Sequence, residues 1–199
     1  MLNPVFAVCI FRRMETVKDR QRQPYYMWYG NSAVIIVDFQ NEWSMEKSPF
    51  YIGRTSIAAK KCSTLVHEAF KNSSPVAYTQ RYMERTDNAF SKYKSRSNIV
   101  EKLRDDRIEK FGRKSWDPFL DTYLDDFLFD KGVEHVYIAG LAVNAGVREC
   151  AESAYNRDLD FTLVKDCCLA ETSEEMQFTL EDLQKYRDIE VRTLRQVVE

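Results

Sequence analysis

Short apolar runs and amphipathic stretches alternate along most of the chain. Residues 33–38 form a continuous apolar run that ends in an aspartate, which is typical of a strand covered on both faces. Residues 57–70 carry apolar side chains at helical spacing, and an Asn-Ser-Ser-Pro sequence at 72–75 ends this predicted helix. The pattern then predicts strands over 76–79, 135–139, 161–164 and 189–191, and helices over 119–129, 144–157 and 174–186.

Other segments are predicted from composition or from one-sided patterning. The polar region 80–98 has no clear period and is predicted to be a long loop over the sheet. Residues 1–31 are interpreted as an N-terminal extension, an extra strand or arm, before a domain over 32–199. The helix over 119–129 is expected to place five side chains on one side: Phe119, Tyr123, Leu124, Phe127 and Leu128.

This order of elements predicts an α/β fold. Five or six strands separated by helices imply a three-layer α/β/α sandwich with a mostly parallel, Rossmann-like central sheet. In such sheets the functional site forms at the carboxyl ends of the strands. Asp38, Thr79, Gln80, the turn over 140–146 and Asp166 all follow or end predicted strands, so we expect them to converge in one crevice.

Composition narrows the class of protein. A chain of 199 residues fits one domain, and its formal charge of -2 gives no reason to expect a nucleic-acid or anionic-membrane partner. The five cysteines form no CxxC pair and no histidine stands at zinc spacing, which favours a reducing, cytoplasmic compartment. We therefore expect a small-molecule substrate and neither a metal nor another cofactor.

Asp38, Lys114 and the glycine turn are the candidate site, and each also has an ordinary structural interpretation. Asp38 either caps a turn or, as a carboxyl group closing a buried strand, acts as a general acid or base. Lys114 either merely precedes a helix or lies beside that carboxylate and holds it ionised. The turn over 140–146 is either a plain connection or a source of backbone N–H groups for a substrate.

These pieces together resemble the isochorismatase-like hydrolase superfamily, which includes nicotinamidases, N-carbamoyl amidohydrolases, ureidoacrylate hydrolases and isochorismatases. Residues 37–40 (Val-Asp-Phe-Gln) are close to the family's V-D-x-Q. Lys114, followed by Phe119, Thr122 and Leu124, is similar to K-x-x-x-x-F-x-x-T-x-L. Residues 140–147 (Gly-Leu-Ala-Val-Asn-Ala-Gly-Val) align with the family's G-x-x-T-x-x-C-V. Residues 162–166 align with a family strand that ends in Asp.

The resemblance implies a set of roles. Asp38 and Lys114 would be catalytic, a cis peptide bond would join Leu141 to Ala142, and the N–H groups of Ala142 and Gly146 would form an oxyanion hole. The chain departs from the family at two positions of the turn, since Val143 replaces a threonine and Gly146 replaces the nucleophilic cysteine. It also has no histidine over 79–84, where nicotinamidases carry metal ligands, which disfavours a nicotinamidase.

Three hypotheses account for Gly146. In the first, the protein resembles isochorismatases, which have glycine there, and Asp38 protonates a vinyl ether so that water completes the cleavage. In the second, the protein is an inactive relative that binds a ligand or a partner. In the third, an amidohydrolase has had its cysteine replaced. The residues expected to bind the substrate are Gln80, Arg81, Trp43, Trp116 and Asn144, although Asn144 is more typical of ureide and carbamoyl hydrolases.

Two further expectations concern a thiol and assembly. Cys150 follows Gly146 by one helical turn and is interpreted as a buried structural cysteine, with a role as a displaced nucleophile as the minor alternative. The aromatic segment 24–29 either covers the domain's own core or favours association, and we expect a homo-oligomer.

Overall fold

The computed structural model describes residues 28–84, 89–92, 94–95, 98–187 and 189–199. Residues 1–27 lie outside these ranges. They include most of the predicted N-terminal extension, Cys9 and the first residues of the aromatic segment. The described residues form an α/β fold around one six-stranded sheet in which every strand pair is parallel. The predicted fold class is therefore confirmed.

The strands of the sheet run in the order β3-β2-β1-β4-β5-β6. Their bounds are β1 Ser32–Val37, β2 Val76–Arg81, β3 Glu109–Arg113, β4 His135–Leu141, β5 Asp160–Leu169 and β6 Glu190–Arg192. The order reverses between β1 and β4, and the crevice at such a reversal is where open α/β sheets bind ligands. β1 and β4 are buried along their whole length, as their apolar sequences predict.

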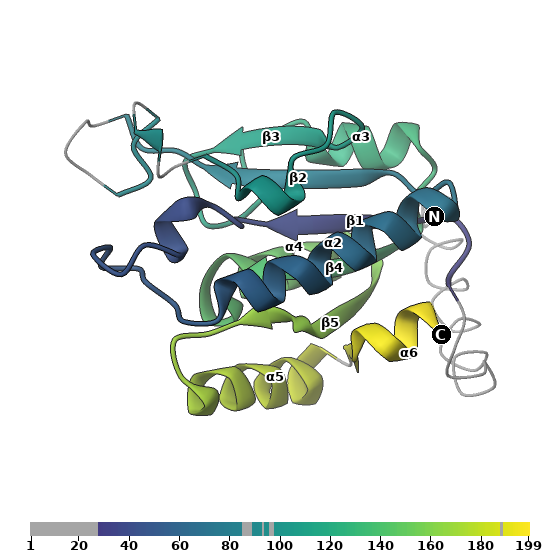
Figure 1. Cartoon of the computed structure of the whole chain (residues 1–199). Helices are drawn as coiled ribbons and strands as arrows, with labels where there is room; N and C mark the ends of the chain where they lie inside the picture. Colours follow the sequence, from purple (N-terminus) through teal and green to yellow (C-terminus); the bar gives the residue numbers. More distant parts are fainter. Residues whose placement is uncertain (1–27, 85–88, 93, 96–97, 188) are drawn as a thin grey trace, which may run out of the picture.

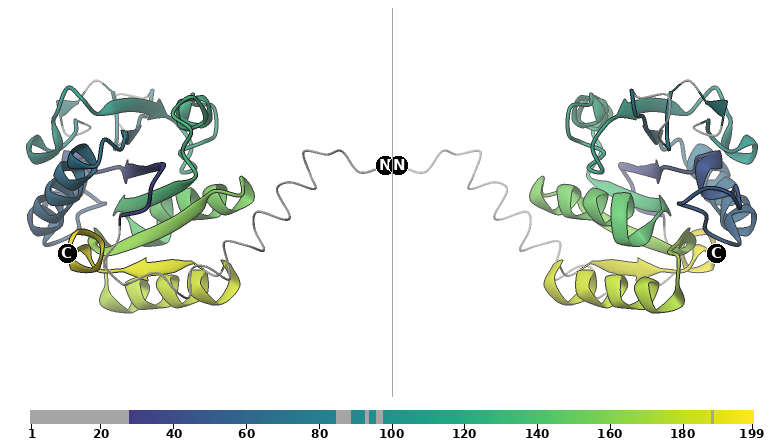
Figure 2. Two further views of the ribbon diagram at one scale, coloured as in Figure 1. Left: turned by 90° about the vertical axis from the view of Figure 1, so that its right-hand side faces the viewer. Right: turned by 90° about the vertical axis from the view of Figure 1, so that its left-hand side faces the viewer.

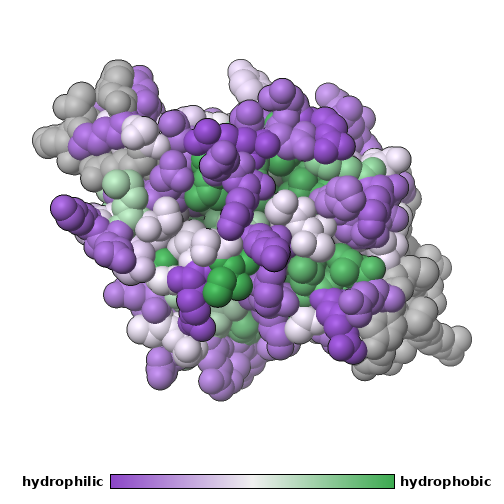
Figure 3. Space-filling view, viewed as in Figure 1, coloured by the Kyte–Doolittle hydropathy of each residue, from purple (hydrophilic) through white to green (hydrophobic). Residues whose placement is uncertain are grey.

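Helices cover both faces of the sheet (Figures 1 and 2). One face carries α2 (Thr55–Lys71) and α6 (Leu194–Val198), and the other carries α3 (Leu124–Asp130), α4 (Arg148–Asn156) and α5 (Ser173–Arg187). Three short helices complete the described elements: the 3₁₀ helices η1 (Asn41–Trp43) and η3 (Glu101–Leu103) and the π-helix η4 (Val143–Val147). The face that bears α2 is largely hydrophilic, with small separate apolar areas (Figure 3).

β3 is an edge strand that the apolar pattern did not predict. Its sequence, Glu-Lys-Phe-Gly-Arg, has one strongly apolar residue, and only Phe111 and Arg113 are buried. It is paired along its length with β2, in which Arg81 is the register partner of Arg113. β2 itself runs to Arg81, so the prediction that the loop begins at residue 80 is wrong.

The helix predicted over 119–129 begins later, at Leu124. Asp121 has a positive φ of 56°, which does not fit a right-handed helix, and the Thr122 hydroxyl accepts a hydrogen bond from the Leu124 N–H at 3.3 Å. As a result Tyr123, expected on the buried side, is 80% exposed. Phe119, Leu124 and Leu128 do lie in the core.

Candidate active site

Asp38 stands where β1 ends, at the reversal of strand order. Its N–H donates to the Thr79 carbonyl at 3.0 Å, and its φ of 52° turns the chain out of the sheet. Asp adopts this left-handed region more readily than most residues do. The side chain turns inward and is 0% exposed, so the carboxyl group is enclosed by protein.

The partner of Asp38 is Arg113, the last residue of β3. Nη2 of Arg113 lies 2.6 Å from Oδ2 of Asp38, and neither side chain has surface exposed to solvent. Nη1 of Arg113 donates to the Ser115 carbonyl, so the guanidinium is held at both ends of its fork. A buried carboxylate needs such a partner, because an unpaired charge in the interior is costly.

Lys114 is not the partner of Asp38, and that geometric prediction is wrong. The Lys114 side chain is 75% exposed, and its Nζ lies 3.5 Å from Oε1 of Glu84. Successive side chains of a strand leave opposite faces, so Arg113 points inward and Lys114, just beyond it, points out. The cation beside Asp38 is therefore displaced by one residue from the motif alignment.

Burial raises the pKa of Asp38 to about 6, although the Arg113 guanidinium acts in the opposite direction. The second carboxyl oxygen, Oδ1, is buried without a hydrogen-bond partner. Arg81 also acts on this carboxylate, and it lies beside Arg113 in the sheet. One carboxylate and two guanidinium groups thus share the site, which leaves a local excess of positive charge.

The turn between β4 and α4 presses against the end of β1. It contains a cis peptide bond between Leu141 and Ala142, as the resemblance implied. Gly140 has a φ of 145°, and a Cβ on it would collide with the backbone of Val37. A Cβ on Gly146 would lie 3.0 Å from Oδ2 of Asp38 and 3.2 Å from Nη2 of Arg113. Gly146 therefore lies directly against the ion pair.

The rest of this turn is held by the Ala142 carbonyl. It accepts hydrogen bonds from the Ala145 N–H at 3.0 Å and the Val147 N–H at 3.2 Å. Ala142, Val143 and Gly146 are buried, whereas Asn144 is exposed. The oxyanion-hole role of Ala142 and Gly146 stays a prediction, as does substrate binding by Asn144.

Gln80 and Arg81 both lie in β2. Gln40 holds the end of this strand, because its side-chain amide accepts the Arg81 N–H at 3.0 Å and donates to the Arg81 carbonyl at 2.9 Å. Gln80 is buried, and as a strand neighbour of Arg81 its side chain leaves the opposite face. The glutamine of the V-D-x-Q sequence thus positions the Arg81 backbone.

An aromatic cluster lies beside the ion pair and is formed by Trp43, Phe50, Phe90 and Trp116. Adjacent rings have centroids 5.0–6.4 Å apart. The Arg81 guanidinium stacks on Trp116, with 3.5 Å from Cζ to the ring centroid. The sequence indicated the two tryptophans but not the two phenylalanines or Arg113. These three residues belong to no motif, and only the folded chain brings them together.

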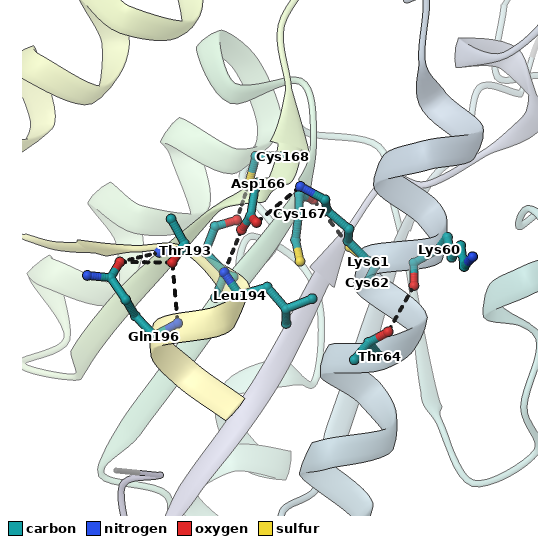
Figure 4. Close-up of polar contacts among 11 residues, drawn as sticks. Lys60, Lys61, Cys62, Thr64, Asp166, Cys167, Cys168, Thr193, Leu194 and Gln196 are labelled. Atoms are coloured by element: carbon teal, nitrogen blue, oxygen red, sulfur yellow. Dashed lines mark hydrogen bonds and ion pairs between the residues drawn. The ribbon is translucent and has the colours of Figure 1, made fainter. Parts of the chain in front are cut away.

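Asp166 does not join this crevice. β5 continues past it to Leu169, and its carboxylate accepts the Leu194 N–H at 2.6 Å and pairs with Lys61 Nζ at 3.1 Å. Figure 4 shows Asp166 between α2 and the start of α6. Its role is to join these two helices to the sheet, so the prediction that it lies in the crevice is wrong.

The four described cysteines are buried free thiols: Cys62, Cys150, Cys167 and Cys168. Cys62 donates its S–H to the Cys167 carbonyl at 3.2 Å (Figure 4). Burial raises the pKa of the Cys150 thiol far above its ordinary value. A reactive cysteine needs the opposite shift, so the structure gives no support to Cys150 as a displaced nucleophile.

The other features of the described residues add no second catalytic cluster. The His135 ring bonds the Thr162 hydroxyl at 3.0 Å in the core. Within the described ranges, no group of three or more His, Cys, Asp or Glu side chains is arranged to hold a metal ion. A cavity of about 110 Å³ lies between α2 and residues 102–108, and no residue of the candidate site lines it.

Comparison with known proteins agrees with this fold. The sequence model of the isochorismatase domain family matches residues 32–195 of this chain. The chain belongs to the isochorismatase family. Members of this family are mostly isochorismatase-like hydrolases. Among the helices of the described chain, none is long and apolar enough to cross a membrane.

Individual family relatives are distant in sequence. The chain is 23% identical over 177 residues to the uncharacterized isochorismatase family protein YaaI of Bacillus subtilis, which covers 85% of this chain and 98% of that protein. An isochorismatase family protein from Desulfovibrio vulgaris is similar in structure, with a TM-score of 0.77, 19% identity and coverage of 82% and 94%. A pyrazinamidase/nicotinamidase from Streptococcus mutans has a TM-score of 0.73, 20% identity and coverage of 80% and 99%.

Proposed function

We propose that this isochorismatase-family protein is a hydrolase that works without a thiol and uses Asp38 as its proton donor. The observation that carries the proposal is the Asp38 carboxyl group itself. It is enclosed at the reversal of strand order, has one oxygen without a partner, and lies against Gly146 where a nucleophilic side chain would otherwise stand. A pKa of about 6 makes it a useful acid near neutral pH.

The charges around Asp38 favour a small anionic substrate. Arg81 and Arg113 both act on the Asp38 carboxylate, so two cations face one carboxylate there. Glu42, in η1, is bonded instead by neutral groups, the Ser48 hydroxyl at 2.7 Å and the Phe90 N–H at 3.3 Å. A substrate carboxylate would balance the excess positive charge. An unsaturated or ring part would pack on the aromatic cluster.

Access to Asp38 requires part of its cover to move, because the carboxyl group is 0% exposed. Arg81 is the part best suited to move. Its guanidinium is held by the stack on Trp116 and by one bond of 3.4 Å from Nε to the Lys114 carbonyl. In the proposed complex it leaves Trp116 and pairs with the substrate anion, so that one residue both covers the site and binds the ligand.

A second candidate function is binding without turnover. The Asp38–Arg113 ion pair favours this alternative. With 2.6 Å between its atoms and no exposure to solvent, the pair also serves as a structural link between the ends of β1 and β3, a role that needs no catalysis. In this alternative the chain is a family member that has kept the fold and recognises a ligand or partner. The third hypothesis, an amidohydrolase that has lost its cysteine, differs from both in requiring a thiol at position 146.

Steady-state assays of the full chain distinguish these functions. The substrates are isochorismate, a ureide, an N-carbamoyl amino acid and nicotinamide. The proposal expects turnover of isochorismate that falls about 10²–10⁴-fold in Asp38→Asn and is unchanged in Lys114→Ala, which serves as the matched control. Treatment with iodoacetamide should leave the rate unchanged. The absence of turnover, with isochorismate binding retained, would instead support the binding protein.

A further inference from the structure

Gly146 and Arg113 meet from two elements that are distant in sequence. Arg113 ends the edge strand β3, whereas Gly146 lies in η4, after the central strand β4. A Cβ on Gly146 would lie 3.2 Å from Nη2 of Arg113, 3.0 Å from Oδ2 of Asp38 and 3.0 Å from Cγ1 of Val37. Such contacts are closer than ordinary van der Waals packing, so each of these three neighbours has to shift by a few tenths of an ångström for any side chain at 146.

None of the three neighbours is free to yield. Val37 is β-branched and fully buried in β1, one of the two central strands. The Asp38 carboxylate is fixed by its contact of 2.6 Å with Arg113, and the other guanidinium nitrogen of Arg113 is bonded to the Ser115 carbonyl. The planar guanidinium therefore holds the carboxylate in a position that a Cβ at 146 would crowd.

We propose that Arg113 and Gly146 are a matched pair, in which Arg113 excludes a nucleophilic side chain at position 146. A lysine at 113 would bring a single compact ammonium on a flexible stem, whereas arginine brings a planar fork held in two places. Arg113 thereby commits the site to chemistry without a covalent enzyme intermediate. Introduction of a thiol by Gly146→Cys alone is then insufficient to install cysteine chemistry. This pairing does not depend on whether the chain turns over a substrate.

Gly140 provides an internal contrast. A Cβ on Gly140 would collide with backbone atoms of Val37, including the nitrogen at 2.7 Å, and its φ of 145° is itself unfavourable for other residues. The obstacle at Gly140 is therefore backbone, which no change of Arg113 can remove. The obstacle at Gly146 is in part the Arg113 side chain, which a substitution can remove.

The test is a thermal-unfolding cycle on the full chain. Gly146→Ala and Gly146→Cys are each made in the native chain and together with Arg113→Lys, and Gly140→Ala is made in both backgrounds as the matched control. We expect Gly146→Ala to lower the Tm of the native chain by about 2–10 °C, and Gly146→Cys to lower it further. With Arg113→Lys, the further loss caused by either change should become smaller without disappearing, because the Val37 contact remains, while the loss caused by Gly140→Ala stays the same.

Two results would overturn the matched pair. One is an equal loss of Tm for Gly146→Ala with and without Arg113→Lys, since additive effects mean that the two sites do not interact. The other is a native-like Tm for Gly146→Cys alone. If Gly146→Cys fails to fold in the native background, its recovery with Arg113→Lys supports the pair, and failure in both backgrounds leaves the decision to Gly146→Ala.

Discussion

Nη2 of Arg113 and Oδ2 of Asp38 lie 2.6 Å apart in the interior, across the ends of β3 and β1, and neither side chain is exposed to solvent. β2 lies between these two strands, so the pair bridges the end of β2, next to the reversal of strand order between β1 and β4. This contact defines the candidate active site, since it fixes the carboxylate, contributes positive charge and bounds the space at Gly146.

Loss of Arg113 should be strongly destabilising. Arg113→Ala leaves the Asp38 carboxylate buried without its partner, and breaking a buried pair from one side costs about 3–5 kcal/mol. Lys114→Ala is the matched control, because Lys114 is the adjacent cation but is 75% exposed, and among the described residues its ion pair is with the exposed Glu84. Urea unfolding should show a large drop in the midpoint for Arg113→Ala and almost none for Lys114→Ala. Similar midpoints for the two variants would contradict the assignment of Arg113 as the partner.

Stability should depend on pH through Asp38. Its pKa is about 6 in the folded chain against 3.8 for an ordinary aspartate, so the folded state binds this proton more tightly than the unfolded state does. The contribution of Asp38 to stability is therefore full below about pH 4 and is lost as the pH rises to about 6, by about 3 kcal/mol.

Urea unfolding of the native chain and of Asp38→Asn from pH 4 to pH 7 measures this effect. The stability of the native chain relative to Asp38→Asn should fall over that range. A difference that does not change with pH, or that rises with it, would show that Asp38 is ionised throughout and would remove the basis for its role as an acid.

Arg81 should govern binding of the substrate anion. Removal of a charge-assisted hydrogen bond costs about 1.5–3 kcal/mol, so Arg81→Ala should raise KM by about 10–100-fold, and a substrate that displaces the native Arg81 from Trp116 should change tryptophan fluorescence. Arg107→Ala is the matched control, since Arg107 stacks on Phe70 at 3.9 Å and pairs with Asp105, both outside the candidate site. Equal KM values for the native chain and Arg81→Ala would exclude this role.

Association of the chain remains a prediction. Trp28 and Tyr29, from the aromatic segment, pack against Tyr137 in the domain, which accounts for part of that segment within one copy. Phe129 is 85% exposed at the end of α3 and Tyr123 is exposed just before this helix, so apolar surface is present on that side. Light scattering at micromolar concentration should give a multiple of the 23.5 kDa chain mass. A mass equal to that of one chain would refute the oligomer.

The sequence predicted the parts of the fold whose signal is local. The central strands β1 and β4 are continuous apolar runs, and Asp38 and the turn over 140–146 follow them directly, so their convergence at the sheet end could be expected. β3 has no apolar run and is an edge strand paired only with β2, so it was missed. Because β3 was missed, the alternation that turns Arg113 inward and Lys114 outward was missed as well.

Partners set by tertiary packing had no sequence signal. Asp166 was expected at the end of a strand, but β5 continues through Cys167 and Cys168 to Leu169, and the carboxylate accepts the Leu194 N–H at the start of α6 instead. Phe50 and Phe90 reach the aromatic cluster from two separate loops. No periodicity within either loop indicates where its phenylalanine packs, because the contact depends on how the loops fold over the sheet.

The pH dependence of kcat/KM for isochorismate, measured with the native chain, Asp38→Asn and Lys114→Ala, tests the central claim most directly. If the protonated Asp38 carboxyl is the acid, kcat/KM of the native chain is level below about pH 6 and falls about tenfold per pH unit above it. Lys114→Ala should keep that profile, while Asp38→Asn should lose both the rate and the pH dependence. A native profile that rises through pH 6, or Asp38→Asn that retains the native rate, would contradict the account.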